Sequence, residues 1–129
     1  MKESLENEGM SRDINAMVSV IHEMNVQAGW YNDIYTGERL NRNIPEMMCL
    51  IHSEISEALE GYRKDLMDNH LPHRKMCEVE LADTFIRLLD LAGYLEYDLG
   101  SAVLEKLAYN KNRDDHKVEN RKKENGKKI

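Results

Sequence analysis

Apolar side chains recur at intervals of three and four residues along most of this 129-residue chain, which is the spacing of one face of an α-helix. No stretch alternates between apolar and polar residues as a half-buried β-strand does. Breaks in the apolar pattern separate four segments, at residues 11–28, 44–66, 74–97 and 101–112. The spacing therefore predicts an all-α fold.

Residues at the ends of these segments support the boundaries. Asn43 precedes Pro45 and Glu46, an order that favours a capped helix start. The stretch MDNHLPHR is rich in turn formers and separates the second helix from the third. Further end signals are Ser11 and Gly29 for the first helix and Ser101 for the fourth.

The two ends of the chain differ in composition from its middle. The first ten residues are polar, and we expect them to fray. Residues 114–129 are basic and carry few apolar side chains, which is typical of a disordered tail. We therefore expect a single all-α domain over residues 1–113, with a frayed N-terminus, followed by a disordered tail over residues 114–129.

Charge and hydropathy argue against several classes of function. The chain has 24 acidic and 18 basic residues with both signs mixed, so we expect no nucleic-acid partner. Cys49 and Cys77 stand alone, as free thiols of a reducing compartment do. No apolar run approaches the ~18 residues of a membrane span. We therefore expect no membrane association and a cytoplasmic location.

Carboxylates interrupt the apolar face of the second helix. On a helical wheel Glu54 falls inside the apolar arc around Ile51, Glu57 lies at its edge, and Glu60 points away. An ionised carboxylate is costly to bury alone, so Glu54 must pair, take up a proton or bind a cation.

A second acidic pair, Glu80 and Asp83, lies at the margin of the third helix's apolar face, with Arg87 and Asp90 on the same side. Two acidic pairs on facing helices would bring four carboxylates together, and oxygen ligands of this kind suit Mg²⁺ or Mn²⁺. Alternatively, Glu54 meets a basic side chain and the other acids are surface charges. Periodicity does not choose between these interpretations.

The apolar face of the third helix is very wide. A face of this width implies packing on more than one side, which favours a partner subunit that completes the core. Its residues are Leu81, Ala82, Phe85, Leu88, Leu89, Leu91, Ala92 and Leu95.

The stretches SEISEALEGYRKD and EVELADTFIRLLDLAGYL resemble the MazG-like, all-α nucleoside triphosphate pyrophosphohydrolases. The family pattern of ExxE, a spacer and ExxD reads here as Glu54–Glu57, 22 residues, and Glu80–Asp83. The resemblance extends over about residues 14–113. It implies a bundle of four to five helices whose core is completed by more than one chain, as a homodimer or homotetramer.

The resemblance also implies a reaction, the hydrolysis of a (deoxy)nucleoside triphosphate to the monophosphate and pyrophosphate. Glu54, Glu57, Glu80 and Asp83 would then hold Mg²⁺, for which Mn²⁺ can substitute. Either Glu54 or Glu57 would instead orient or deprotonate the attacking water. Some phage members of the family prefer dGTP and others act on several deoxynucleotides, so we expect a deoxynucleotide substrate, with dGTP a candidate, for pool control or supply of a monophosphate.

Two further sets of residues are candidates for substrate contacts. The segment EKLAYNKNR resembles the family's late Lys…Asn…Arg segment, which makes Lys106, Asn110 and Arg113 candidates for binding phosphate. Asn25, which continues the apolar stripe of the first helix, and Trp30, just past its end, are candidates for binding the base.

Two other functions compete with the hydrolase. A di-iron carboxylate bundle would need Glu-x-x-His, and none of the five histidines has an acidic residue three positions before it. A non-enzymatic helical module, used for oligomerisation or regulation, would pair its acids structurally and would need no metal.

Overall fold

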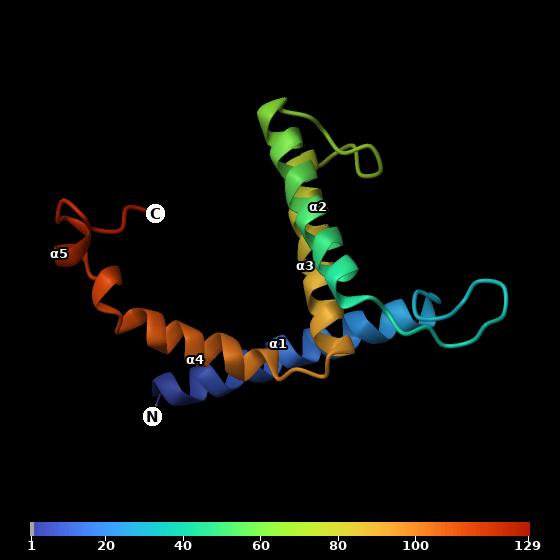
Figure 1. Ribbon diagram of the computed structural model, residues 1–129, viewed down its shortest axis with the longest axis horizontal. Coiled ribbons are helices and arrows are strands. Elements are labelled where there is room, and N and C mark those ends of the chain that lie inside the picture. Colours follow the sequence, from blue (N-terminus) through green and yellow to red (C-terminus); the bar gives the residue numbers. More distant parts are fainter. Residues whose placement is uncertain (1) are drawn as a thin grey trace. The chain divides into compact units, whose positions relative to one another are not determined.

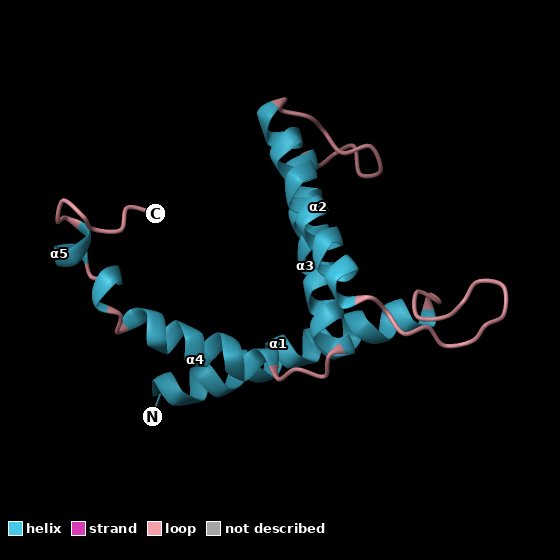
Figure 2. Cartoon of the chain, in the orientation of Figure 1, coloured by secondary structure: helices cyan, strands magenta, loops and turns pink. Residues whose placement is uncertain are grey.

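The computed structural model describes residues 2–129, which form helices joined by loops (Figure 2). In these residues the elements are five α-helices and one 3₁₀ turn, with no named β-strand. The predicted all-α class is confirmed. None of the described helices combines the length and the apolar character needed to cross a bilayer.

The chain divides into two compact units. One unit consists of the N-terminal residues up to Ala16 together with Asp98–Ile129. The other unit is Met17–Tyr97. The first helix, α1 (Lys2–Gln27), contributes residues to both. The predicted division at residue 113 stays a prediction.

Helix α1 begins well before Ser11, so the predicted N-cap is wrong. The residues before Ser11 contain no proline, and Lys2 and Glu6 form an i,i+4 pair at 4.0 Å that supports an earlier start. The predicted end is confirmed, because α1 stops at Gln27 and Gly29 follows with φ of 89°, a conformation that glycine adopts without strain.

Helix α2 (Ile44–Arg63) and helix α3 (Met76–Tyr94) lie side by side as an antiparallel pair (Figure 1). The predicted cap of α2 is confirmed, since the Asn43 side chain accepts a hydrogen bond from the Glu46 backbone N–H at 3.1 Å. A Cβ at Gly61 would lie 2.8 Å from the Met76 side chain, so this glycine allows the close approach of the pair.

Both helices end earlier than the apolar spacing predicted. Asp65 follows α2 with φ of 50°, and Glu96 follows α3 with φ of 57°. A residue in this left-handed region cannot continue a right-handed helix. The two ends are therefore set by backbone conformation at non-glycine residues.

The core of the Met17–Tyr97 unit lies where the second half of α1 and the following loop meet the α2–α3 pair. Its centre is formed by Tyr31, Met47 and Leu91, and partly buried apolar residues surround it. Gly93 is inside α3, and a Cβ there would lie 2.6 Å from the His22 side chain of α1. The glycine thus provides room for a neighbouring helix.

Much of the apolar surface of α2 and α3 is not covered by the chain itself. On α2, Leu59 is 58% exposed and Tyr62 is 75% exposed. Other large apolar side chains on the pair are exposed as well, namely Met48, Ile55, Leu81, Phe85 and Leu88. The wide apolar faces of the sequence therefore correspond to exposed surface in a single chain.

The unit that contains Asp98–Ile129 is organised around helix α4 (Leu99–Lys111). Its N-cap is Asp98 and not Ser101, because the Asp98 carboxylate accepts from the Ser101 backbone N–H at 3.2 Å. Asn15 of α1 bonds both to Asp98 and to the Gly100 backbone N–H, each at 2.8 Å. The C-terminal residues contain a 3₁₀ turn, η1 (Asp114–His116), and a short helix, α5 (Val118–Arg121).

Candidate metal centre

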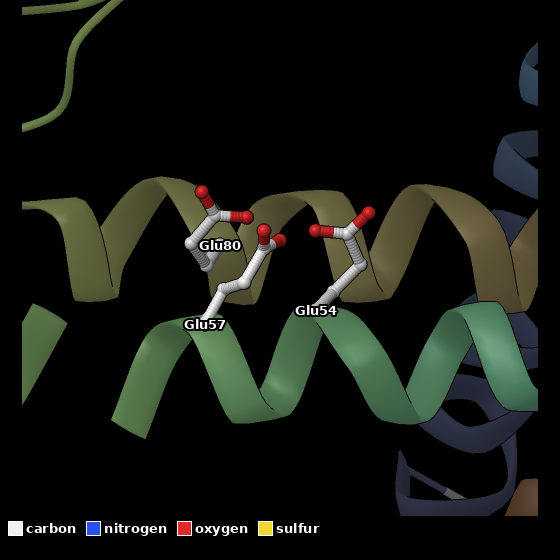
Figure 3. A group of neighbouring side chains, drawn as sticks. All are labelled: Glu54, Glu57 and Glu80. Atoms are coloured by element: carbon white, nitrogen blue, oxygen red, sulfur yellow. The ribbon is translucent and has the colours of Figure 1, made fainter. Parts of the chain in front are cut away.

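Three of the four predicted metal ligands converge on one face of the α2–α3 pair. Glu54 and Glu57 extend from α2 toward Glu80 of α3 (Figure 3). One carboxylate oxygen from each lies within 4.8 Å of those of the other two. The helix geometry explains this meeting, because residues at i and i+3 project from one side of α2 toward its neighbour.

The donor set fits a hard divalent cation. All three groups offer carboxylate oxygens, which Mg²⁺ and Mn²⁺ prefer over nitrogen or sulfur. Glu54 is buried, Glu80 is partly buried and Glu57 is exposed, so an ion would be reached from solvent on the Glu57 side. Asp83, the fourth predicted ligand, is outside this group of three and lines the same pocket as Glu54.

Burial and contacts among the acids raise the pKa of three carboxyl groups at this site. Burial, a hydrogen bond with Glu54 and the charges of nearby acids raise the pKa of Glu80 to about 7. The pKa of Glu57 is also raised, chiefly by its hydrogen bond with Glu54. Burial and then the charge of Glu54 raise the pKa of Asp83. Near neutral pH the cluster therefore retains a proton that a divalent cation would displace.

Glu54 behaves differently from its neighbours because of Arg87. Burial alone would raise the pKa of Glu54, but hydrogen bonds from Arg87, Glu80 and Glu57 outweigh it and lower the pKa. The Arg87 Nε donates to Glu54 Oε1 at 2.7 Å. The sequence had left open whether Glu54 pairs with a basic side chain or approaches the other acids, and it does both.

A pocket of about 350 Å³ opens beside the carboxylates. Asn25 and Trp30, the predicted base-binding residues, both line it together with Glu54 and Asp83. Trp30 is 66% exposed, so its ring is available for stacking. The remaining lining residues are Arg42, Met47, Leu50, Ile86, Arg87 and Asp90.

Asp90 forms the centre of a polar network that the sequence did not reveal. Its carboxylate accepts from the Tyr31 hydroxyl at 2.9 Å and contacts His22 Nδ1 at 2.8 Å. Burial first, and then the hydrogen bond to Asp90, raise the pKa of Tyr31 well above its usual range. The i,i+7 spacing of Asp83 and Asp90 on α3 placed Asp90 on the correct side, but nothing in the sequence indicated Tyr31 as its partner.

The predicted phosphate-binding residues belong to the unit that contains α4. Lys106 lies 4.7 Å from the centre of the Tyr109 ring, and Arg113 pairs with Asp115 through two hydrogen bonds of 2.9 and 2.6 Å. Asn110 Oδ1 is buried and has no hydrogen-bond partner within residues 2–129. That these three side chains bind phosphate stays a prediction.

Comparison with protein-family models, with curated proteins and with solved structures gave no match to this chain. The features of this chain that bear on its function are therefore the three converging carboxylates and the pocket beside them.

Proposed function

We propose that this protein is a Mg²⁺-dependent nucleoside triphosphate pyrophosphohydrolase of the MazG-like type. Its substrate would be a deoxynucleoside triphosphate, with dGTP a candidate, and its products the monophosphate and pyrophosphate. The observation that most supports this function is the convergence of Glu54, Glu57 and Glu80 beside a pocket that Asn25 and Trp30 line.

The carboxylates are the proposed metal ligands. Glu54, Glu57 and Glu80 supply oxygens within 4.8 Å of one another, and Asp83 adds a fourth acid in the pocket that Glu54 lines. When bound, Mg²⁺ or Mn²⁺ neutralises phosphate charge and lowers the pKa of a coordinated water.

The proposed reaction is an in-line hydrolysis at the α-phosphorus. The water oxygen forms a bond to this atom while the bond from it to the α,β-bridging oxygen breaks. The bridging oxygen leaves with pyrophosphate, and the water proton passes to a carboxylate and then to solvent. Either Glu54 or Glu57 can take this proton, since both extend from α2 into the cluster.

The pocket provides the proposed site for the nucleoside. Trp30 offers an exposed ring face that can stack on a base, and Asn25 offers an amide that can both donate to and accept from a base edge. Lys106, Asn110 and Arg113 remain proposed phosphate ligands on the basis of their charge and spacing.

We propose further that the exposed apolar faces of α2 and α3 pack against another copy of the chain, as a homodimer or homotetramer. Leu59 and Tyr62 on α2, and Phe85 on α3, are each close to half exposed or more. Burying such residues stabilises an assembly by roughly 25 cal/mol per Å² of apolar surface. A Leu59→Glu variant should therefore shift toward monomer in size-exclusion chromatography with light scattering, and an unchanged mass would place the interface elsewhere.

One observation favours the competing, non-enzymatic module. The 2.7 Å contact between Arg87 and Glu54 is the structural pairing that such a module would use. Within residues 2–129, however, Glu57 and Glu80 have no ion pair with a basic side chain, and a purely structural role does not account for their approach to Glu54.

The test of the proposed function is a product assay with each deoxynucleoside and ribonucleoside triphosphate, with and without Mg²⁺. The hydrolase predicts pyrophosphate release that depends on Mg²⁺. Orthophosphate as the first product would refute the reaction type. No turnover with any triphosphate, together with an intact oligomer, would favour the non-enzymatic module.

A further inference from the structure

Arg87 contacts a carboxylate that is also a proposed metal ligand. It extends from α3, and its Nε donates to Glu54 Oε1 at 2.7 Å. Glu54 is also one of the three acids whose oxygens converge. The Arg87 side chain is 43% exposed, whereas that of Glu54 is 10% exposed, so the arginine can move more freely than its partner.

A cation bound at Glu54 would conflict with this contact. A guanidinium group has no lone pair, so Arg87 cannot itself be a metal ligand. It is positively charged at any physiological pH, and a divalent ion on the same carboxylate would repel it at close range. Arg87 and a metal ion therefore compete for Glu54.

The pocket offers Arg87 another role. Of the residues that line it, the cationic ones are Arg42 and Arg87. Arg42 is held elsewhere, because its Nη1 donates to the Trp30 backbone carbonyl at 3.0 Å and its guanidinium lies 5.5 Å from the centre of the Tyr31 ring. Arg87 is thus the pocket cation that lies against the carboxylates, where the phosphates of a substrate would be.

We propose that Arg87 exchanges partners during substrate binding, pairing with Glu54 before a metal ion is bound and with a phosphate group of the nucleotide afterwards. This inference rests on the proposed function and adds a substrate-binding residue that the carboxylate motif does not contain. Arginine suits the role because its planar, multiply donating head matches phosphate as well as carboxylate. The exchange links metal binding to substrate binding through one side chain.

The experiment measures two affinities in the full-length chain and in three variants. The first is the affinity for Mn²⁺ without nucleotide, and the second is the affinity for an α,β-methylene deoxynucleoside triphosphate in saturating Mn²⁺. Trp30 is the single tryptophan and lines the pocket, so its fluorescence can report the second. The variants are Arg87→Gln, Arg87→Lys and, as a matched control, Arg74→Gln, which removes an ion pair of 2.7 Å with exposed Glu78.

In Arg87→Gln, Mn²⁺ should bind more tightly than in the unmodified protein, because the competing cation is gone. The nucleotide analogue should bind about 10- to 100-fold more weakly, the effect of losing a charged hydrogen bond. Arg87→Lys keeps the charge without the planar head, so its affinities for Mn²⁺ and for the analogue should lie between those of the unmodified protein and of Arg87→Gln. It serves as the test if the glutamine variant does not fold. Arg74→Gln should leave both affinities unchanged.

Analogue affinity within twofold of the unmodified protein in both Arg87 variants would overturn the exchange, as would weaker Mn²⁺ binding, which would show that Arg87 only holds Glu54 in place. Failure of the unmodified protein to bind Mn²⁺ would overturn the proposed metal-dependent function together with this inference. Normal Mn²⁺ binding and turnover in Arg87→Gln would overturn the exchange alone.

Discussion

The α2–α3 pair carries two groups of acids, Asp90 with its polar partners and the Glu54, Glu57 and Glu80 cluster, and they are stabilised in opposite ways. The Asp90 carboxylate accepts a hydrogen bond from Tyr31 and contacts His22, so its buried charge has partners. Glu54, Glu57 and Glu80 face one another, and Arg87 forms an ion pair with Glu54 at 2.7 Å. The first arrangement holds a core together. The second accumulates like charge that a bound cation would relieve.

This difference separates structural acids from candidate functional acids without reference to a motif. A carboxylate that is buried in a stable protein is expected to have well-placed donors, as Asp90 does. Three converging carboxylates, of which Glu57 and Glu80 have raised pKa values, are destabilising in isolation and need a compensating role. Substitutions in the carboxylate cluster should therefore change turnover, whereas substitution of Asp90 should change the free energy of unfolding.

The largest expected effect is on turnover. Glu54→Gln and Asp83→Asn each remove a ligand charge while keeping the shape of the side chain, and each should lower turnover about 10²- to 10³-fold, since ligand loss removes several kcal/mol of charge stabilisation. The measurement is pyrophosphate release at saturating Mg²⁺, with circular dichroism to confirm folding. Glu60→Gln is the matched control on α2, because Glu60 pairs with Arg63 and Lys64 outside the cluster. Full activity in either acidic variant would remove that residue from the site.

The next effect is on stability and concerns the other group. Asp90→Asn replaces the charged acceptor of the buried Tyr31 hydroxyl, and should lower the free energy of unfolding by about 1.5–3 kcal/mol, the range for a hydrogen bond to a charged group. Urea unfolding monitored by circular dichroism gives this value. Glu57→Gln, in the exposed part of the cluster, should be neutral or stabilising in Mg²⁺-free buffer. Equal destabilisation by both substitutions would end the distinction between the two groups.

The pH dependence of stability should sharpen the comparison. The pKa of Glu80 rises from its ordinary value of 4.5 to about 7 in the folded protein. Between these values the folded state holds the Glu80 proton more tightly than the unfolded state does. The contribution of Glu80 to stability is therefore greatest below pH 4.5 and is lost as the pH rises through 7. The raised pKa values of Glu57 and Asp83 act in the same direction.

Thermal unfolding in chelator at pH 5.5 and pH 8 tests this sign. The loss of stability at pH 8 should be smaller in Glu80→Gln, which carries no titrating group there. Added Mg²⁺ should raise the melting temperature more at pH 8 than at pH 5.5, because the ion must displace the proton. A Mg²⁺ effect that is equal at both values, or greater at pH 5.5, would contradict an origin in these acids.

The sequence predicted the local parts of this arrangement well. Asn43, Pro45 and Glu46 act on one another within a single helical turn, so the start of α2 could be predicted. The i,i+3 spacing within each acidic pair likewise fixes which side chains share a helix face. Such relations depend on helix geometry alone.

The parts that could not be predicted depend on which distant residues meet. Arg87 and Glu54 are 33 positions apart, and Tyr31 and Asp90 are 59 apart. Helical spacing places each residue on a face but does not select its partner on another element. The ends of α2 and α3 were missed for a different reason, since Asp65 and Glu96 adopt positive φ without the glycine that usually signals it.

The smallest expected effect concerns the base. Asn25 and Trp30 line the pocket next to the acids, and Asn25→Ala would remove an amide from its wall without touching the carboxylate cluster. Relative rates among the four deoxynucleoside triphosphates should therefore change several-fold, about 1 kcal/mol, while the rate with the best substrate changes less. Competition assays with pairs of triphosphates measure this preference directly. A preference that stays constant in Asn25→Ala but changes in Trp30→Leu would assign base discrimination to stacking, and the amide would then belong to the structural group with Asp90.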